Sequence, residues 1–276
     1  MADEAYTDLP RPFYDNWSRS LRPAAHALWA WHSALATAPA MGGNGTEASV
    51  EAFYKEERER AEAGEPMRLL RESVWTEAYA VCEEHDLDRG LLGAQAEAAR
   101  HLHGRTRFET AATLDRFVRM WAVPHGRLLA GLAGADFSTQ VKCADELARG
   151  FFYLGRLLRL PADVEQRRLF IPLEDVRQAD VSIRQLREGA VDESVRRLLW
   201  KQSVRVRDAL AQGQPLISDL GLRHRYALKR WWLGALEMLS ELERRDYDLW
   251  REPVRLPWYR RFQVYLHSLF GRATAR

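Results

Sequence analysis

The 276-residue sequence lacks several features that would otherwise indicate its class of protein. It contains only two cysteines, Cys82 and Cys143, which excludes a disulfide-rich scaffold and predicts reduced thiols in an intracellular protein. No stretch approaches the roughly 20 apolar residues that a membrane-spanning helix needs. Residues 1–8 are acidic and carry no apolar run, so we expect no signal peptide. These absences predict a cytoplasmic protein that touches a membrane, if at all, only at its surface.

The basic residues are also unusual in type, because nearly all of them are arginine and lysine occurs at only four positions. The formal net charge is +2, which is too small to indicate nucleic acid as a partner. Arginine can hold a phosphate with two hydrogen bonds, but it is equally suited to salt bridges. We therefore expect most of the arginines to lie on solvated helix faces.

Strand signals are almost absent, since there is no convincing alternating run and no Asn-Gly hairpin. Apolar residues instead recur at helical spacing, as at Leu228, Trp232 and Leu236. No repeat or low-complexity linker divides the chain, so we predict an all-α protein with one domain over residues 1–276. The predicted helices cover residues 22–38, 47–63, 67–85, 88–103, 110–134, 139–158, 183–212 and 218–246, followed by a short amphipathic segment at 257–270.

Common catalytic motifs are missing as well. The sequence has no HExxH, GxSxG, GxGxxG or P-loop pattern, and neither cysteine stands in a motif that indicates a nucleophile. Any site must therefore be found from longer stretches of the chain.

Three such stretches carry a resemblance. Residues 21–40, LRPAAHALWAWHSALATAPA, have an Arg-Pro start followed by Trp29 and Trp31. Residues 108–134 contain the core AVPHGR, and residues 151–176 contain FIPLED, the most specific piece. These stretches resemble the squalene/phytoene synthase family, and within it the bacterial hydroxysqualene synthases of the hopanoid route. The C-terminal sequence from ERRDYDLW to YLHSLF resembles the tail of the same enzymes.

The resemblance implies the all-α isoprenoid synthase fold, in which helices surround a central cavity. It also implies head-to-head prenyl transfer, in which two aspartate-rich motifs on facing helices bind Mg²⁺ through carboxylate oxygens. The metal stabilises the departing diphosphate, and aromatic walls shield the resulting carbocation.

The sequence departs from the family at the decisive positions. In register with the first motif, DDxxD, it reads ATAPA, with Ala36, Thr37 and Ala40 in the aspartate positions. In register with the second motif, DxxxD, Arg159 replaces the first aspartate and only Asp163 is retained. One carboxylate cannot hold a magnesium cluster, so we expect neither a metal site nor another cofactor.

Four arginines near the second motif offer a different chemistry. Arg156, Arg159, Arg167 and Arg168 could contact a diphosphate directly, in place of a metal. The alternative is a salt-bridged loop, in which Asp163 pairs with one of them.

Aromatic residues on the resembling stretches could line an isoprenoid-sized cavity. The candidates are Trp29, Trp31, Trp121, His125 and Phe152. The alternative is ordinary packing in the helical core, which is common for such residues.

The leading hypothesis is a divergent family member in isoprenoid metabolism, a pseudoenzyme with a degenerate DDxxD motif. It would bind an isoprenoid or isoprenoid diphosphate, or scaffold an active family paralogue. One alternative is a working hydroxysqualene or squalene synthase whose site is rebuilt from Glu109, Asp115, Asp145 and Glu146. Another is a protein-assembly factor with no lipid ligand. Residues 258–270 mix aromatic side chains with arginine, so this segment could lie on a membrane or a partner instead of docking on the domain.

Overall fold

The computed structural model describes residues 17–37, 47–66, 68, 70–102 and 106–270. Helices make up nearly all of the regular structure, which confirms the all-α prediction. The helices of the N-terminal half are α1 (Arg22–Thr37), α2 (Glu47–Ala63), α3 (Glu72–Glu84), α4 (Gly90–Ala98), a 3₁₀ turn η3 (Ala99–Leu102), α5 (Ala111–Leu132) and α6 (Ser138–Leu158). Those of the C-terminal half are α7 (Leu160–Glu165), α8 (Leu173–Gln178), α9 (Ile183–Glu188), α10 (Glu193–Gly213), α11 (Pro215–Asp219), α12 (Leu222–Arg244) and α13 (Trp258–Phe270).

One predicted helix, over residues 183–212, is wrong as a continuous element. The chain leaves the helix at Gly189, whose φ of 69° is a left-handed conformation that glycine adopts without steric cost. A new helix starts after Asp192, whose carboxylate accepts a hydrogen bond from the Val195 N–H. The helix predicted over 218–246 is also interrupted, because α11 ends at Asp219 and α12 begins at Leu222.

Three short elements that the sequence did not predict lie between α6 and α9. Helices α7 and α8 are six residues each, too short for a periodic pattern to be visible. Between them, β2 (Arg168–Leu169) pairs in parallel with β1 (Thr106–Arg107). This pairing fixes the segment after η3 against the segment after α7.

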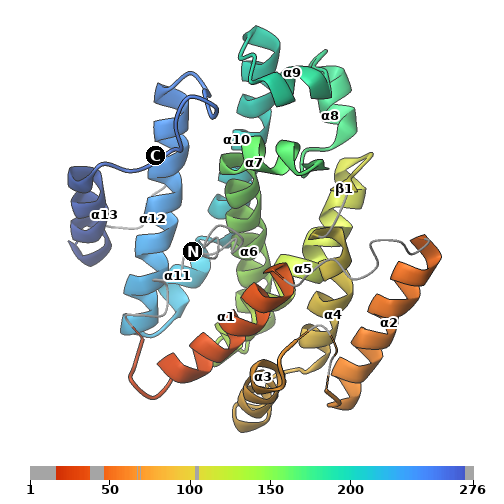
Figure 1. Ribbon diagram of the computed structural model, residues 1–276. Helices are drawn as coiled ribbons and strands as arrows, with labels where there is room; N and C mark the ends of the chain where they lie inside the picture. The colour runs from red at the N-terminus through yellow and green to blue at the C-terminus, as the bar shows by residue number, and fades with distance from the viewer. Residues whose placement is uncertain (1–16, 38–46, 67, 69, 103–105, 271–276) are drawn as a thin grey trace.

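Helix α6 is the centre of the bundle and packs most extensively on α10 and α5 (Figure 1). Glycines permit the close approach on both sides. A Cβ atom added at Gly126 of α5 would lie 2.6 Å from the Cβ of Ala148, and one added at Gly213 of α10 would lie 2.5 Å from the Leu147 side chain. The backbones of these three helices therefore lie unusually close together, and the helices position the residues described below.

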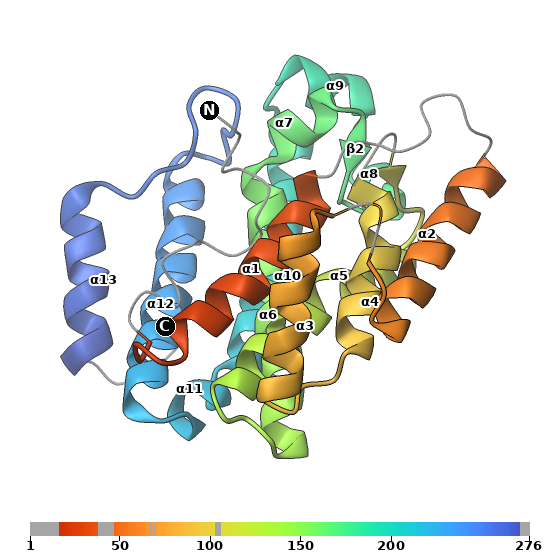
Figure 2. The same ribbon diagram turned by 60° about the horizontal axis from the view of Figure 1, so that its bottom comes forward.

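The outer helices are attached more loosely. Figure 2 shows α2 at one side of the molecule, where it packs on α4, and α13 at the opposite side, where it packs on α12. Within the part of the chain that the structure describes, no helix combines the length and apolar character needed to cross a bilayer.

Candidate functional site

The end of α1 holds the stretch that we placed in register with the first aspartate-rich motif of the resembling family. Ala36 is buried there, and the Thr37 hydroxyl is exposed and donates a hydrogen bond to the Ser33 carbonyl at 2.9 Å. Ala40 lies outside the described residues. The described part of this helix end therefore presents a methyl group and a hydroxyl that is already bonded, and no carboxylate.

The second motif falls where α6 ends and α7 begins. Arg159 is the residue at which α6 stops, and Pro161 stands in the first turn of α7, where its missing N–H is no loss. Asp163 follows in that same turn. Arg159 and Asp163, the two positions in register with this motif, therefore lie on either side of a change of helix.

Asp163 is the centre of a buried ion-pair network. Its carboxylate lies 3.3 Å from an Arg156 guanidinium nitrogen and 3.1 Å from one of Arg168, and all three side chains are at most 5% exposed. Arg168 also donates a hydrogen bond to the Leu102 carbonyl at 2.7 Å. Burial raises the pKa of the Asp163 carboxyl, while the neighbouring guanidiniums oppose that shift. Of the two readings open for Asp163, the structure shows pairing with arginine.

Three of the four arginines predicted to contact a diphosphate surround Asp163, because Arg159 is also close enough to oppose the rise in the pKa of its carboxyl. Arg156 and Arg168 face Asp163, whereas Arg167 is exposed and has a φ of 60°. The guanidinium of Arg156 also lies 4.3 Å from the centre of the Phe170 ring. The hollow beside this network has a volume of about 10 Å³, room for about one water molecule.

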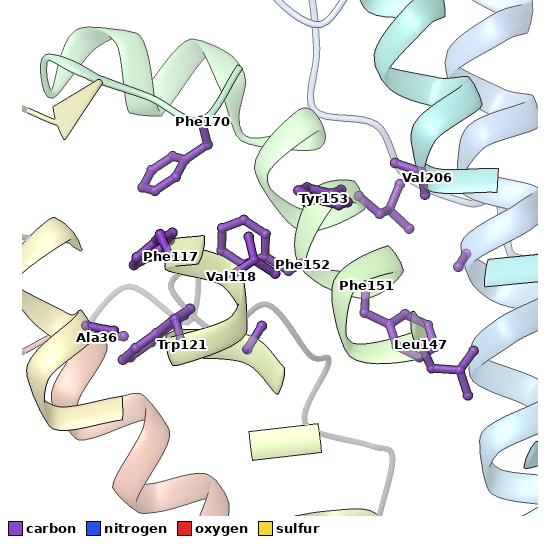
Figure 3. Packing of buried hydrophobic residues seen from close by; sticks show 14 of the residues in the cluster. Ala36, Phe117, Val118, Trp121, Leu147, Phe151, Phe152, Tyr153, Phe170 and Val206 are labelled. Carbon is purple, nitrogen blue, oxygen red and sulfur yellow. The ribbon is translucent and has the colours of Figure 1, made fainter. Parts of the chain in front are cut away.

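The aromatic residues pack against one another. Figure 3 shows Phe117, Phe152 and Phe170 together with Trp121, and the centres of the three phenyl rings are 5.7–5.9 Å apart. Trp31, Trp121, His125 and Phe152 are each at most 1% exposed, and Trp29 is half-buried.

None of the predicted cavity residues lines any of the three best-defined hollows in the described part of the chain. The most apolar of these hollows is elsewhere, between α5, α6, α11 and α12, and holds about 50 Å³. Ring-on-ring packing therefore describes these residues better than the wall of an open cavity.

A buried pair of histidines belongs to the same region. The rings of His32 and His125 stack with centres 4.2 Å apart, and Nδ1 of His32 lies 2.8 Å from the Gln95 side-chain oxygen. Burial, with a smaller contribution from His32, lowers the pKa of His125 well below its ordinary value. His125 is therefore a neutral core residue at neutral pH.

This depressed pKa predicts that acid destabilises the protein. Below about pH 6.5 the unfolded chain binds a proton at His125 that the folded chain does not, so stability is lost as the pH falls. Between pH 7 and pH 5 this residue alone should lower the free energy of unfolding by about 2 kcal/mol. Urea denaturation at several pH values should show a smaller acid-side slope for His125→Leu than for the wild type. Part of the slope should remain, because burial also lowers the pKa of His101 to about 4. Equal slopes would contradict the prediction.

The candidate replacement carboxylates are each paired with arginine. Asp115 lies 2.7 Å from Arg149, Asp145 lies 2.6 Å from Arg127, and Glu146 lies 2.6 Å from Arg149. Glu109 is exposed and lies 3.2 Å from Arg177. Among the described residues, no three histidine, cysteine or acidic side chains are grouped so that they could hold a metal ion. The donor set therefore does not fit a magnesium cluster.

The FIPLED stretch contains two acidic residues whose roles the sequence did not reveal. Glu174 accepts a hydrogen bond from the Ala111 N–H at 2.6 Å, which caps the start of α5. Asp175 lies 2.7 Å from Lys201 and 3.0 Å from Arg205, so it ties α8 to α10. Burial would raise the pKa of Asp175, but hydrogen bonds from Lys201 and Gln202 hold it below its ordinary value. Both carboxylates serve the packing of the fold.

Helices arranged around α6, with motif positions at the ends of α1 and α6, define the all-α isoprenoid synthase class. The squalene/phytoene synthase family model matches residues 17–261, and the chain belongs to that family.

Solved structures agree in fold. Squalene synthase HpnC from Alicyclobacillus acidocaldarius is 21% identical with a TM-score of 0.71, covering 86% of this chain and 88% of that one. A dehydrosqualene synthase in complex with ligand is 15% identical with a TM-score of 0.70, covering 92% of each chain. YisP from Bacillus subtilis subsp. subtilis strain 168 is 13% identical with a TM-score of 0.62, covering 93% and 99%. No curated protein matches the sequence. At these identities the likeness shows the fold alone.

Proposed function

We propose that this chain is a non-catalytic member of the squalene/phytoene synthase family that scaffolds active family members in squalene or hopanoid metabolism. The observation that carries the proposal is the state of Asp163. It is the one carboxylate that matches an aspartate-rich motif, and it is 1% exposed and paired with Arg156 and Arg168. A carboxylate held in this way is not available to a metal ion that bridges to a diphosphate.

The typical rate loss on removal of a charged group supports the loss of catalysis. Removal of one preorganised charged group from a site typically costs about 10²–10³ in rate. Here Ala36, Thr37, Ala40 and Arg159 stand at four motif aspartate positions, and Asp163 is engaged elsewhere. Such losses are not additive, but their combination should bring magnesium-dependent ionisation below detection.

Scaffolding is favoured over storage of an isoprenoid for two reasons. Pockets for organic ligands typically hold about 300–1,000 Å³ and are mostly apolar, whereas the hollow beside Asp163 holds about 10 Å³ and the apolar one about 50 Å³. A third hollow, between α6 and α10, holds about 360 Å³, but charged side chains such as Arg149, Lys201 and Arg205 line it, which does not suit an isoprenoid chain. In addition, the buried guanidiniums of Arg156 and Arg168 contact Asp163 and do not face an open anion site.

The test is incubation of the purified chain with farnesyl diphosphate or presqualene diphosphate, each with and without Mg²⁺. We expect no magnesium-dependent product and no thermal stabilisation by either diphosphate. Product is measured by gas chromatography and stabilisation by the shift in Tm. An active synthase of the squalene/phytoene synthase family serves as the positive control. Mixed with this chain, it should co-elute in size-exclusion chromatography.

Each other outcome has a distinct meaning. Magnesium-dependent product would overturn the proposal and support a relocated site. Stabilisation by a diphosphate without product would replace scaffolding with isoprenoid diphosphate binding. Absence of both ligand binding and co-elution with the synthase would also overturn scaffolding, and would favour assembly of unrelated proteins.

A further inference from the structure

Helix α13 carries the densest group of exposed large apolar side chains in the described chain. Six of its thirteen residues are at least 36% exposed although they are aromatic or aliphatic. They are Trp258 (79%), Tyr259 (47%), Phe262 (55%), Tyr265 (46%), Leu266 (36%) and Phe270 (84%). We call these six residues the α13 stripe.

The α13 stripe lies on one side of the helix. At about 100° per residue, positions 258, 262, 265 and 266 fall within a narrow sector. The opposite side holds the helix against α12, through the buried residues Val264 and Ser268 and through Arg260, which lies 3.6 Å from Glu237. The prediction that this segment docks on the domain is thus confirmed for one face only. The six apolar side chains of this face are exposed, and α13 itself lies at the edge of the molecule (Figures 1 and 2).

Positive charge accompanies the stripe. Residues 251–276 contain six arginines and a single acidic residue, Glu252, although the whole chain carries a formal charge of only +2. Arg251, Arg255 and Arg261 are exposed, and α13 itself contains no acidic residue. The segment that carries the α13 stripe is therefore more basic than the chain as a whole.

We propose that the α13 stripe docks this protein on an anionic lipid bilayer, with α13 lying in the plane of the interface. A helix with a broad aromatic face and flanking arginines inserts its apolar side at the headgroup boundary, while its cations attract anionic lipids. Tryptophan and tyrosine favour this boundary because each combines an apolar ring with a polar N–H or O–H group. An acidic protein partner would supply the charge but would not need a continuous row of six apolar side chains. This inference does not rest on the proposed function.

The test is co-sedimentation of the full chain with phosphatidylglycerol vesicles and with phosphatidylcholine vesicles. We expect binding to the anionic vesicles, weakened by added salt, and much weaker binding to the neutral ones. The variant W258S/F262S should lower the partition coefficient at least tenfold. The matched control F137S/L222S removes two side chains that are 67% and 64% exposed elsewhere, and should bind like the wild type.

A second pair of variants tests the charge. R255Q/R261Q should weaken binding to anionic vesicles by about fivefold per arginine. The matched pair R116Q/R184Q, which removes two exposed arginines from other helices, should have little effect. All four variants replace exposed side chains, so unchanged thermal unfolding confirms that each is folded.

Three outcomes would overturn the inference. The first is that the wild type does not sediment with anionic vesicles, and the second is that W258S/F262S binds as well as F137S/L222S. The third is self-association that depends on the α13 stripe and excludes vesicles, which would assign this face to a second copy of the chain.

Discussion

Replacement of Asp163 by alanine is expected to lower the free energy of unfolding by about 3–5 kcal/mol, because it leaves two buried guanidiniums without their counter-ion. Arg156 and Arg168 are at most 5% exposed and both contact this carboxylate. Neither can turn toward water without opening the packing between α6, α7 and β2. Urea denaturation followed by circular dichroism measures the loss.

A matched control separates this effect from the loss of any ion pair. Glu188→Ala removes the partner of Arg184, but that pair is exposed, and exposed pairs contribute about 0–1 kcal/mol. The stability of the wild type should also be insensitive to Mg²⁺. Magnesium-dependent stabilisation that disappears in Asp163→Ala would instead identify Asp163 as a metal ligand and contradict its assignment to the core.

The second large effect concerns Trp121. Its truncation to alanine should cost about 3–5 kcal/mol, since it removes a fully buried indole that packs against the tilted ring of His32 with ring centres 4.2 Å apart. If Trp121 lined an open cavity, as the sequence allowed, the truncation would enlarge that cavity without breaking core contacts and would cost much less. Thermal and urea unfolding both report the difference.

The same substitution elsewhere in the chain provides the control. Trp258 is 79% exposed on α13, so Trp258→Ala should change the free energy of unfolding by no more than about 0.5 kcal/mol. Similar losses at Trp121 and Trp258 would mean that the aromatic cluster is not a packed core.

Much of the fold could be predicted from the sequence because long helices leave a periodic signature. Helices α1, α2, α5 and α6 begin and end within about two residues of the predicted ranges. The break at Gly189 could not be predicted in the same way, since apolar spacing continues through α9 and α10 and only the backbone conformation reveals the turn. Short elements such as α8 contain too few residues for a period to appear.

The sequence predicted which carboxylates the candidate site lacks, but not which side-chain contacts take their place. That Ala36 and Arg159 stand at motif aspartate positions was predicted from their register with the family, and it stays a prediction. Asp163 pairs with both Arg156 and Arg168 because β2 brings Arg168 back toward α6. Residue spacing along the chain does not reveal that approach. The sequence identified the aromatic side chains of this region. It did not decide whether they line a cavity or pack against one another, because that depends on packing in three dimensions.

The close contacts around α6 also bear on how the molecule opens. At Gly126, Gly150 and Gly213 the neighbouring helices have no room for even one added carbon atom, so α5, α6 and α10 can separate only together. Their backbone amides should then exchange with solvent deuterons only when the whole protein unfolds, whereas α2 and α13 each pack mainly on one neighbour and can fray locally. The molecule thus joins a slowly exchanging centre to edges that open on their own, and the aromatic α13 stripe is carried on one of those edges.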